Sequence, residues 1–211
     1  MNIDNITQFL ARVIVLLIAL PMHESAHGLV AYWLGDPTAK DARRITLNPI
    51  RHLDIVGGLC LLFAGVGWAK PVPIDPRYFR KPKRDMALSA LAGPVSNFLL
   101  AVLAIILLKV YLLLVPADTT FATLVALIFY YMVFINIALA IFNMLPVPPF
   151  DGSRIFLTFL PAKWYFGLMK YERYIMIGIF FLMVIGILDT PLSFLYNGVF
   201  KGLDWATSWI Q

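Results

Sequence analysis

Three ionisable side chains lie within five residues of one another in the stretch "LIALPMHESAHGLVAYW": His23, Glu24 and His27. In a helix, residues four apart lie on one face, so both imidazoles can bind a single zinc ion through ring nitrogens. The glutamate between them is then well placed to take a proton from a water in the open coordination position. The spacing therefore predicts a catalytic metal centre.

The residues around this motif are those of a membrane-spanning helix. An ionisable side chain at the centre of a bilayer costs roughly 2.5–3.5 kcal/mol even on lenient insertion scales. Three such side chains inside an apolar stretch argue against chance. A purely structural pair of histidines remains the alternative.

A catalytic zinc site uses three protein ligands and leaves a fourth position to water. The segment "NMLPVPPFDGSR" offers Asp151 directly after a later apolar stretch. His23 lies about 17 residues into its helix, or roughly 25 Å along it at 1.5 Å per residue. Both side chains are then expected near the same face of the membrane, and Asp151 is the candidate third ligand.

The elements that must position these residues are predicted from composition and apolar length. The chain has 211 residues, of which 61% are hydrophobic and 14% are charged, whereas soluble domains carry about 25% charged residues. The prediction is an all-α polytopic membrane protein with about four spans, forming a single domain over residues 1–211. The motifs lie within residues 20–160, and residues 161–211 add a helix and an interfacial tail. The expected spans are about Ile6–Leu34, Met86–Val115, Phe121–Met144 and Tyr174–Leu188.

The loop between the first two spans has two unusual segments. Gly57–Trp68 is apolar but too short to span, and its glycines disfavour a regular helix, so we expect a re-entrant or β-hairpin-like loop. "KPVPID" then follows as an extended segment, because alternating prolines block a helix.

Charge orients the bundle. Ten of the seventeen Lys and Arg residues lie between positions 40 and 84, which places this loop in the cytoplasm and the amino terminus outside. The site is then expected towards the cytoplasmic face. The basic stretch at residues 77–85 could resemble a nucleic-acid patch, but anionic lipid head groups explain it fully, so no nucleic-acid partner is expected.

Taken in order, "HESAH" in a span, "AGPVSN" opening a later span and "NMLPVPPFDG" closing the next resemble the site-2 protease family of intramembrane zinc metalloproteases. "LNPIRHLDIVGG" and "GWAKPVPID" are similar to its compact bacterial and archaeal branch, which lacks PDZ or nucleotide-sensing domains. The resemblance implies a multi-pass protein of a prokaryotic cell membrane with Zn²⁺ held by His23, His27 and Asp151. It also implies Glu24 as the catalytic base and cleavage within or beside transmembrane helices. Phe150 departs from the leucine that often precedes the aspartate.

Five further residues are candidates for contact with substrate, each with a structural alternative. Asn143 either caps a helix or binds the substrate backbone, and Asn97 either links helices or acts near the site. His52 is either a loop residue or a residue that lines or shapes the site. Val72 and Ile74 lie in an extended edge that could pair with a substrate chain by strand addition.

Two other functions stay open: a membrane metal or proton transporter, and a non-catalytic membrane scaffold. A transporter would spread its ligands along a path, whereas these cluster towards one face. A degenerate scaffold would usually have lost Glu24 or a ligand. The expected partners are transmembrane substrates and the lipid bilayer, and the sequence leaves the oligomeric state open.

Overall fold

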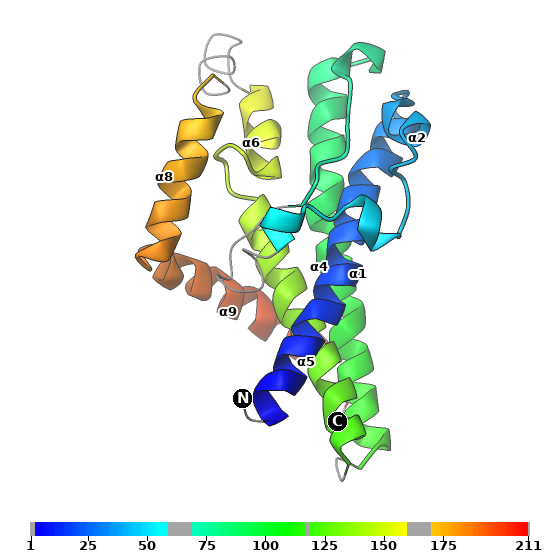
Figure 1. The fold of residues 1–211 in the computed structure, drawn as a ribbon, viewed down its shortest axis with the longest axis vertical. Helices are drawn as coiled ribbons and strands as arrows, with labels where there is room; N and C mark the ends of the chain where they lie inside the picture. The colour runs from blue at the N-terminus through cyan, green and yellow to red at the C-terminus, as the bar shows by residue number, and fades with distance from the viewer. Residues whose placement is uncertain (1–2, 59–68, 117–118, 160–169, 211) are drawn as a thin grey trace.

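The computed structural model describes residues 3–58, 69–116, 119–159 and 170–210 (Figure 1). Within these ranges the regular secondary structure is helical, and none of the described residues forms a strand. The bounded helices are α1 (Ile3–Trp33), α2 (Thr38–Asp41), η1 (Pro49–Arg51), η2 (Pro76–Tyr78), α4 (Pro82–Leu114), α5 (Thr120–Asn143), α6 (Asp151–Phe156), η3 (Leu157–Phe159), α8 (Glu172–Val184) and α9 (Asp189–Ala206).

Three helices are long and apolar enough to cross a membrane: 28 residues of α1 (Ile6–Trp33), the 33 residues of α4 and the 24 residues of α5. Their bounds lie close to those expected for the first three spans. The all-helical fold and these three candidate spans are therefore confirmed.

The fourth expected span is not confirmed. The apolar stretch there forms α8, which has 13 residues, whereas crossing the hydrocarbon core takes about 20. Gly186 follows with a φ of +77°, a left-handed conformation that ends helices. The predicted re-entrant or β-hairpin-like loop falls largely on residues 59–68, which lie outside the described residues. Residues 69–75 carry no regular secondary structure, as expected for an extended segment.

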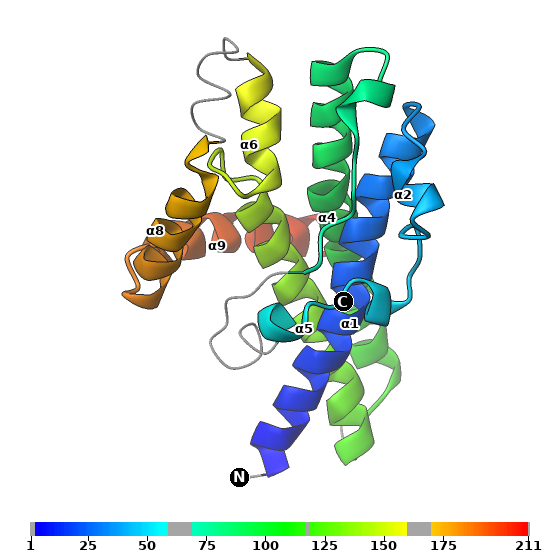
Figure 2. The ribbon, with the colours of Figure 1, turned by 45° about the horizontal axis from the view of Figure 1, so that its top comes forward.

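The three long helices run alongside one another, with α4 antiparallel to α1 and α5 (Figures 1 and 2). Buried residues recur at intervals of four on the inner faces of α1 and α4, which is the spacing of one helical face. On α1 they are Ala11, Val15, Ala19, His23 and His27, and on α4 they are Ser89, Gly93, Asn97, Ala101 and Ile105. Small residues on both faces let the two backbones approach closely.

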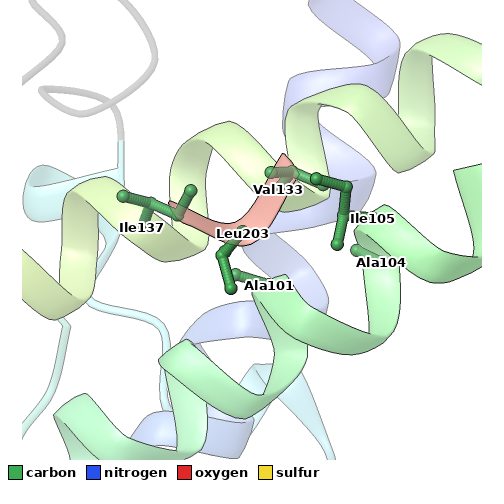
Figure 3. Close-up of a cluster of buried hydrophobic side chains, with 6 residues drawn as sticks. All are labelled: Ala101, Ala104, Ile105, Val133, Ile137 and Leu203. Carbon is green, nitrogen blue, oxygen red and sulfur yellow. The ribbon is translucent and has the colours of Figure 1, made fainter. Parts of the chain in front are cut away.

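The carboxyl-terminal helix α9 crosses this bundle and contributes to its core. Leu203 packs with Ala101 and Ile105 of α4 and with Ile137 of α5 (Figure 3). Lys109 of α4 pairs with Asp204 at 2.8 Å and also donates to the carbonyl of Thr207 at the end of α9. This packing was not expected for an interfacial tail, whose depth in the bilayer stays a prediction.

Asp36 connects the end of α1 to the extended segment 69–75. Its side chain is fully buried, and one carboxylate oxygen accepts hydrogen bonds from the backbone N–H and hydroxyl of Thr38. The other oxygen accepts the backbone N–H of Asp75 at 2.7 Å. One side chain thus joins the chain leaving α1 to the segment that returns over it.

Replacing Asp36 with alanine is expected to destabilise the protein by about 1–3 kcal/mol, because buried N–H groups lose their acceptor. The unfolding midpoint in mild detergent measures this effect. Asp41→Ala, which removes an exposed carboxylate in α2, is the matched control. Equal midpoints for the two variants would contradict the assignment.

Candidate metal centre

Three side-chain atoms converge where α1 meets the start of α6. The Nε2 atoms of His23 and His27 lie 3.0 Å apart. Asp151 Oδ2 lies 3.2 Å from each of them. Both histidines are buried, and the aspartate side chain is 17% exposed. Among the described residues these three form a group able to offer one ligand atom each to a metal ion.

The chemistry and spacing of this group fit a metal. Two ligands held 2.0–2.1 Å from a tetrahedral zinc are about 3.3–3.4 Å apart, close to the separations found here. Asp151 Oδ2 is buried and has no hydrogen-bond partner in the described structure, although two imidazole nitrogens lie beside it. A carboxylate oxygen left without a donor in this way is suited to a cation.

The surroundings of Asp151 also favour the charged form of its carboxyl group. Burial, the largest influence on Asp151, raises its pKa, but the two neighbouring imidazoles lower the pKa by more. The net result is a pKa well below the ordinary range for an aspartate. The side chain is therefore an anion, which is the form that binds a metal.

Helix α4 supports the imidazole pair through its backbone. The carbonyl of Ser89 lies 2.7 Å from Nδ1 of His27, a contact that holds the ring with Nε2 towards Asp151. Gly93 lies directly against both rings, and a Cβ atom there would be 2.3 Å from His27 Nε2 and 2.6 Å from Cε1 of His23. Only glycine lets α4 approach the pair so closely.

Asp151 is positioned by the turn that follows α5. Phe150, the residue before it, packs edge-to-face on Phe142 of α5 with ring centroids 4.8 Å apart. The departure from leucine noted in the sequence thus provides an aromatic contact. Gly152 lies against the end of α5, where a Cβ atom would be 2.3 Å from the carbonyl oxygen of Met144. These two neighbours hold the aspartate beside α1.

Glu24 faces the extended segment 69–75. Its carboxylate oxygen Oε2 accepts the backbone N–H of Val72 at 2.8 Å, and its side chain is half-buried. Val72 is buried and packs over Gly28, where a Cβ atom would come within 3.2 Å of its side chain. The segment therefore lies across α1 at the level of the metal centre.

His52 helps to hold that segment. Its Nε2 lies 2.8 Å from the carbonyl of Thr46, which also accepts the hydroxyl of Ser25 at 2.6 Å. Its own carbonyl accepts the backbone N–H of Lys70 at 2.9 Å. Burial lowers the pKa of His52, partly offset by the Thr46 carbonyl and the Glu24 carboxylate. His52 is thus a buried residue whose contacts join the loop to the segment, and its functional role stays a prediction.

The other sequence candidates differ in accessibility. Asn143 is half-buried at the end of α5, and its Nδ2 donates to the carbonyl of Leu139 at 3.0 Å. Asn97 is fully buried on α4. Ile74 is half-buried, and its backbone N–H makes no hydrogen bond within the described ranges. Their roles towards substrate stay predictions.

Some of the groups that hold the metal-centre residues in place could not be identified from the sequence. Ser89 and Thr46 act through backbone carbonyls, which any residue could supply. Gly152 could have been suspected from the "FDG" triplet and Gly93 from "AGP", but the close contacts that require them depend on the tertiary structure.

An apolar cavity of about 520 Å³ lies beside the turn that carries Asp151. Met144 and Leu145 of that turn line it, together with Pro94 of α4, Ile141 of α5 and Val199 of α9. The cavity lies where an apolar side chain or chain segment could reach the vicinity of the metal centre.

Comparison with known proteins gives consistent matches. The model of peptidase family M50 matches residues 112–186, a range that includes Asp151 but not the two histidines. "Putative zinc metalloprotease YwhC" of Bacillus subtilis is 43% identical over 152 residues, covering 71% of this chain and 68% of that protein. "Putative zinc metalloprotease Rip2" of Mycolicibacterium smegmatis is 29% identical over 141 residues, covering 64% and 52%; that of Mycobacterium tuberculosis is 30% identical with the same coverage. The chain thus spans about half the length of the mycobacterial relatives. No solved structure matches the chain.

Replacing Gly93 with alanine is expected to displace both imidazoles, because the new methyl group would overlap their rings. Metal affinity should fall about 10–100-fold, the range found when the support of metal ligands is changed. Competition with a chelator measures the affinity. Gly198→Ala in α9, where a Cβ atom meets nothing within 4 Å, is the control. Unchanged affinity in the Gly93 variant would refute the close contact.

Proposed function

The chain belongs to peptidase family M50, and from that premise we propose that it is an intramembrane zinc metalloendopeptidase of the His-Glu-x-x-His type. Its proposed reaction is hydrolysis of peptide bonds within or next to transmembrane segments, as in regulated intramembrane proteolysis. The observation that carries the proposal is the convergence of His23, His27 and Asp151 within 4.8 Å, with Glu24 on the same helix. The proposed unit is a single domain over residues 1–211.

Zinc is the metal implied by the family and by the relatives named as zinc metalloproteases, and His23, His27 and Asp151 would hold it. A zinc ion with three such ligands supplies a Lewis acid that activates water and polarises a carbonyl group.

Glu24 is the proposed general base. It accepts a proton as water attacks the scissile carbonyl, and it then passes the proton to the leaving amine. The Val72 N–H, 2.8 Å from Oε2, restricts the orientation of the carboxylate, and its second oxygen makes no hydrogen bond within the described residues. The half-buried position of Glu24 keeps it accessible to substrate.

Asn143 is the proposed donor to the substrate backbone and to the negative charge on the attacked carbonyl oxygen. One hydrogen of its Nδ2 is committed to the carbonyl of Leu139. An amide nitrogen carries two hydrogens, so the second remains available. The bond to α5 then orients the group that acts on the substrate.

A helical substrate must become extended before cleavage, because its carbonyls are otherwise engaged within the helix. Segment 69–75 is the proposed partner for the extended chain, through backbone pairing along Val72 and Ile74. Pro71 and Pro73 have no N–H, and the N–H of Val72 is engaged with Glu24. Ile74 offers a donor that makes no hydrogen bond within the described residues.

The substrates and surroundings follow from the same reasoning. The three apolar helices support an integral membrane protein, and we propose a multi-pass protein of a prokaryotic cell membrane with the amino terminus outside. The metal centre then lies towards the cytoplasmic face. The apolar cavity beside Met144 and Leu145 supports transmembrane segments as substrates, since it can receive apolar side chains near the scissile bond.

The decisive experiment is co-expression with a panel of single-span membrane proteins, comparing wild type with Glu24→Gln. Cleavage by the variant should fall about 10²–10⁴-fold, because general acid–base catalysis is lost. Zinc content, measured on the purified protein, should be unchanged. Undiminished proteolysis would refute the assignment, and zinc flux into liposomes without cleavage would favour a transporter.

Asp151→Ala is the counterpart variant, and it should lower both cleavage and zinc content because a ligand is removed. Metal analysis separates the two roles: zinc is retained in the Glu24 variant and reduced in the Asp151 variant. Equal stoichiometry in all three proteins would exclude Asp151 as a ligand.

Replacing Ile74 with proline is expected to raise the KM for a membrane substrate several-fold while leaving the unfolding midpoint close to that of wild type. The substitution removes a backbone donor that makes no hydrogen bond within the described structure. Ile74→Val, which keeps the donor, is the control and should behave like wild type. A KM equal in both variants would rule out pairing at this position.

A further inference from the structure

The two histidines of the metal centre are supported unequally. Nδ1 of His27 lies 2.7 Å from the carbonyl of Ser89. Nδ1 of His23 is buried and has no hydrogen-bond partner in the described part of the chain. An imidazole that binds a metal through Nε2 carries its proton on Nδ1, and this N–H almost always has an acceptor. His23 therefore lacks an expected partner.

The side chain of Asn97 in α4 also lacks hydrogen-bond partners among the described residues. Its side chain is 0% exposed, and neither its Oδ1 nor its Nδ2 has a partner within the described ranges. A buried amide without hydrogen bonds destabilises the folded state. Such an arrangement in an apolar bundle calls for a partner that the side chain can reach.

The order of contacts along α4 places Asn97 on the His23 side of Gly93. Gly93 touches the rings of both His27 and His23. Asn97 lies one turn after Gly93 on the same buried face of α4, and α4 runs antiparallel to α1 (Figure 1). One turn along α4 from Gly93 is thus the direction of His23 rather than of His27. The Asn97 side chain leans back towards the amino-terminal end of α4, and so towards Gly93.

Asn136 of α5 is the other fully buried asparagine, and it is less suited to this role. Its Oδ1 is also buried without a partner among the described residues, but its Nδ2 donates to the carbonyl of Met132 in its own helix at 2.8 Å, whereas both polar atoms of Asn97 lack a partner. The next residue, Ile137, packs against Ala101, which lies a full turn beyond Asn97 and farther from Gly93. Asn136 therefore provides a natural control.

We propose that Asn97 is a positioning residue for the metal centre: its Oδ1 accepts the Nδ1–H of His23 when Nε2 binds the metal. Ser89 does the same for His27 through its backbone carbonyl, so α4 supports the two ligands from positions one turn before and one turn after Gly93. Asn97 then acts through His23 and does not touch the substrate. This inference rests on the proposed zinc site.

The test is zinc affinity, measured by chelator competition on purified full-length protein. Asn97→Leu keeps the volume but removes the acceptor, and its affinity should fall about 10–100-fold. Asn97→Asp supplies a carboxylate acceptor and should bind zinc as tightly as wild type or more tightly. Asn136→Leu should stay within about threefold of wild type, a difference below that expected for a lost partner.

The outcomes separate the two proposals. Wild type that binds no zinc would overturn the metal site itself. Wild-type affinity in Asn97→Leu, or an equal loss in Asn97→Leu and Asn97→Asp, would overturn the role of Asn97 while leaving the site intact.

A second measurement is available if Asn97→Leu does not fold. The chain has three histidines, so ¹⁵N-labelled histidine gives few ring signals in the zinc-loaded protein. The Nδ1–H of His23 should shift on Asn97→Asp, because a carboxylate is a stronger acceptor than an amide. An unchanged His23 signal would overturn the proposal.

Discussion

The contact between Asp151 and the imidazole pair of α1 is the constraint on which the rest of the structure depends. Each ionisable group would be costly alone at membrane depth. Together they lie 3.0–3.2 Å apart with their ligand atoms turned towards one another. Bringing them together requires α1 and the end of α5 to reach the same level with α4 beside both, which is the arrangement of the three long helices.

Close packing of α1 on α4 follows from that requirement. At the metal centre the two helices meet through Gly93, and farther along the same faces lie the small buried residues Ala19 and Ala101. Without a hydrophobic driving force in lipid, small residues let helices associate through van der Waals contact and polar bonds. These faces also carry the backbone carbonyl of Ser89, which lies 2.7 Å from Nδ1 of His27.

The features that could be predicted from the sequence are those that depend on side-chain type and spacing. Apolar length predicted α1, α4 and α5, and the spacing of four predicted that His23 and His27 share a face. The expected fourth span is not confirmed, because the helix in that stretch, α8, ends at Val184 and Gly186 follows with a left-handed backbone. The contacts of the Ser89 and Thr46 carbonyls with His27 and His52 could not be predicted, because every residue has a backbone carbonyl. Tertiary structure decides which carbonyls face a histidine.

Segment 69–75 lies over α1 and is held there by hydrogen bonds, one of which reaches Glu24. Pro71 and Pro73 have no N–H. The N–H of Lys70 bonds to the carbonyl of His52. The N–H groups of Val72 and Asp75 bond to the carboxylates of Glu24 and Asp36. Two of these bonds hold the segment in place, but the third ends on the proposed base. In the proposed function, an extended substrate chain pairs at Ile74, whose N–H makes no hydrogen bond within the described residues. The Val72 N–H then stays with Glu24 and orients the proposed base while the chain lies beside it.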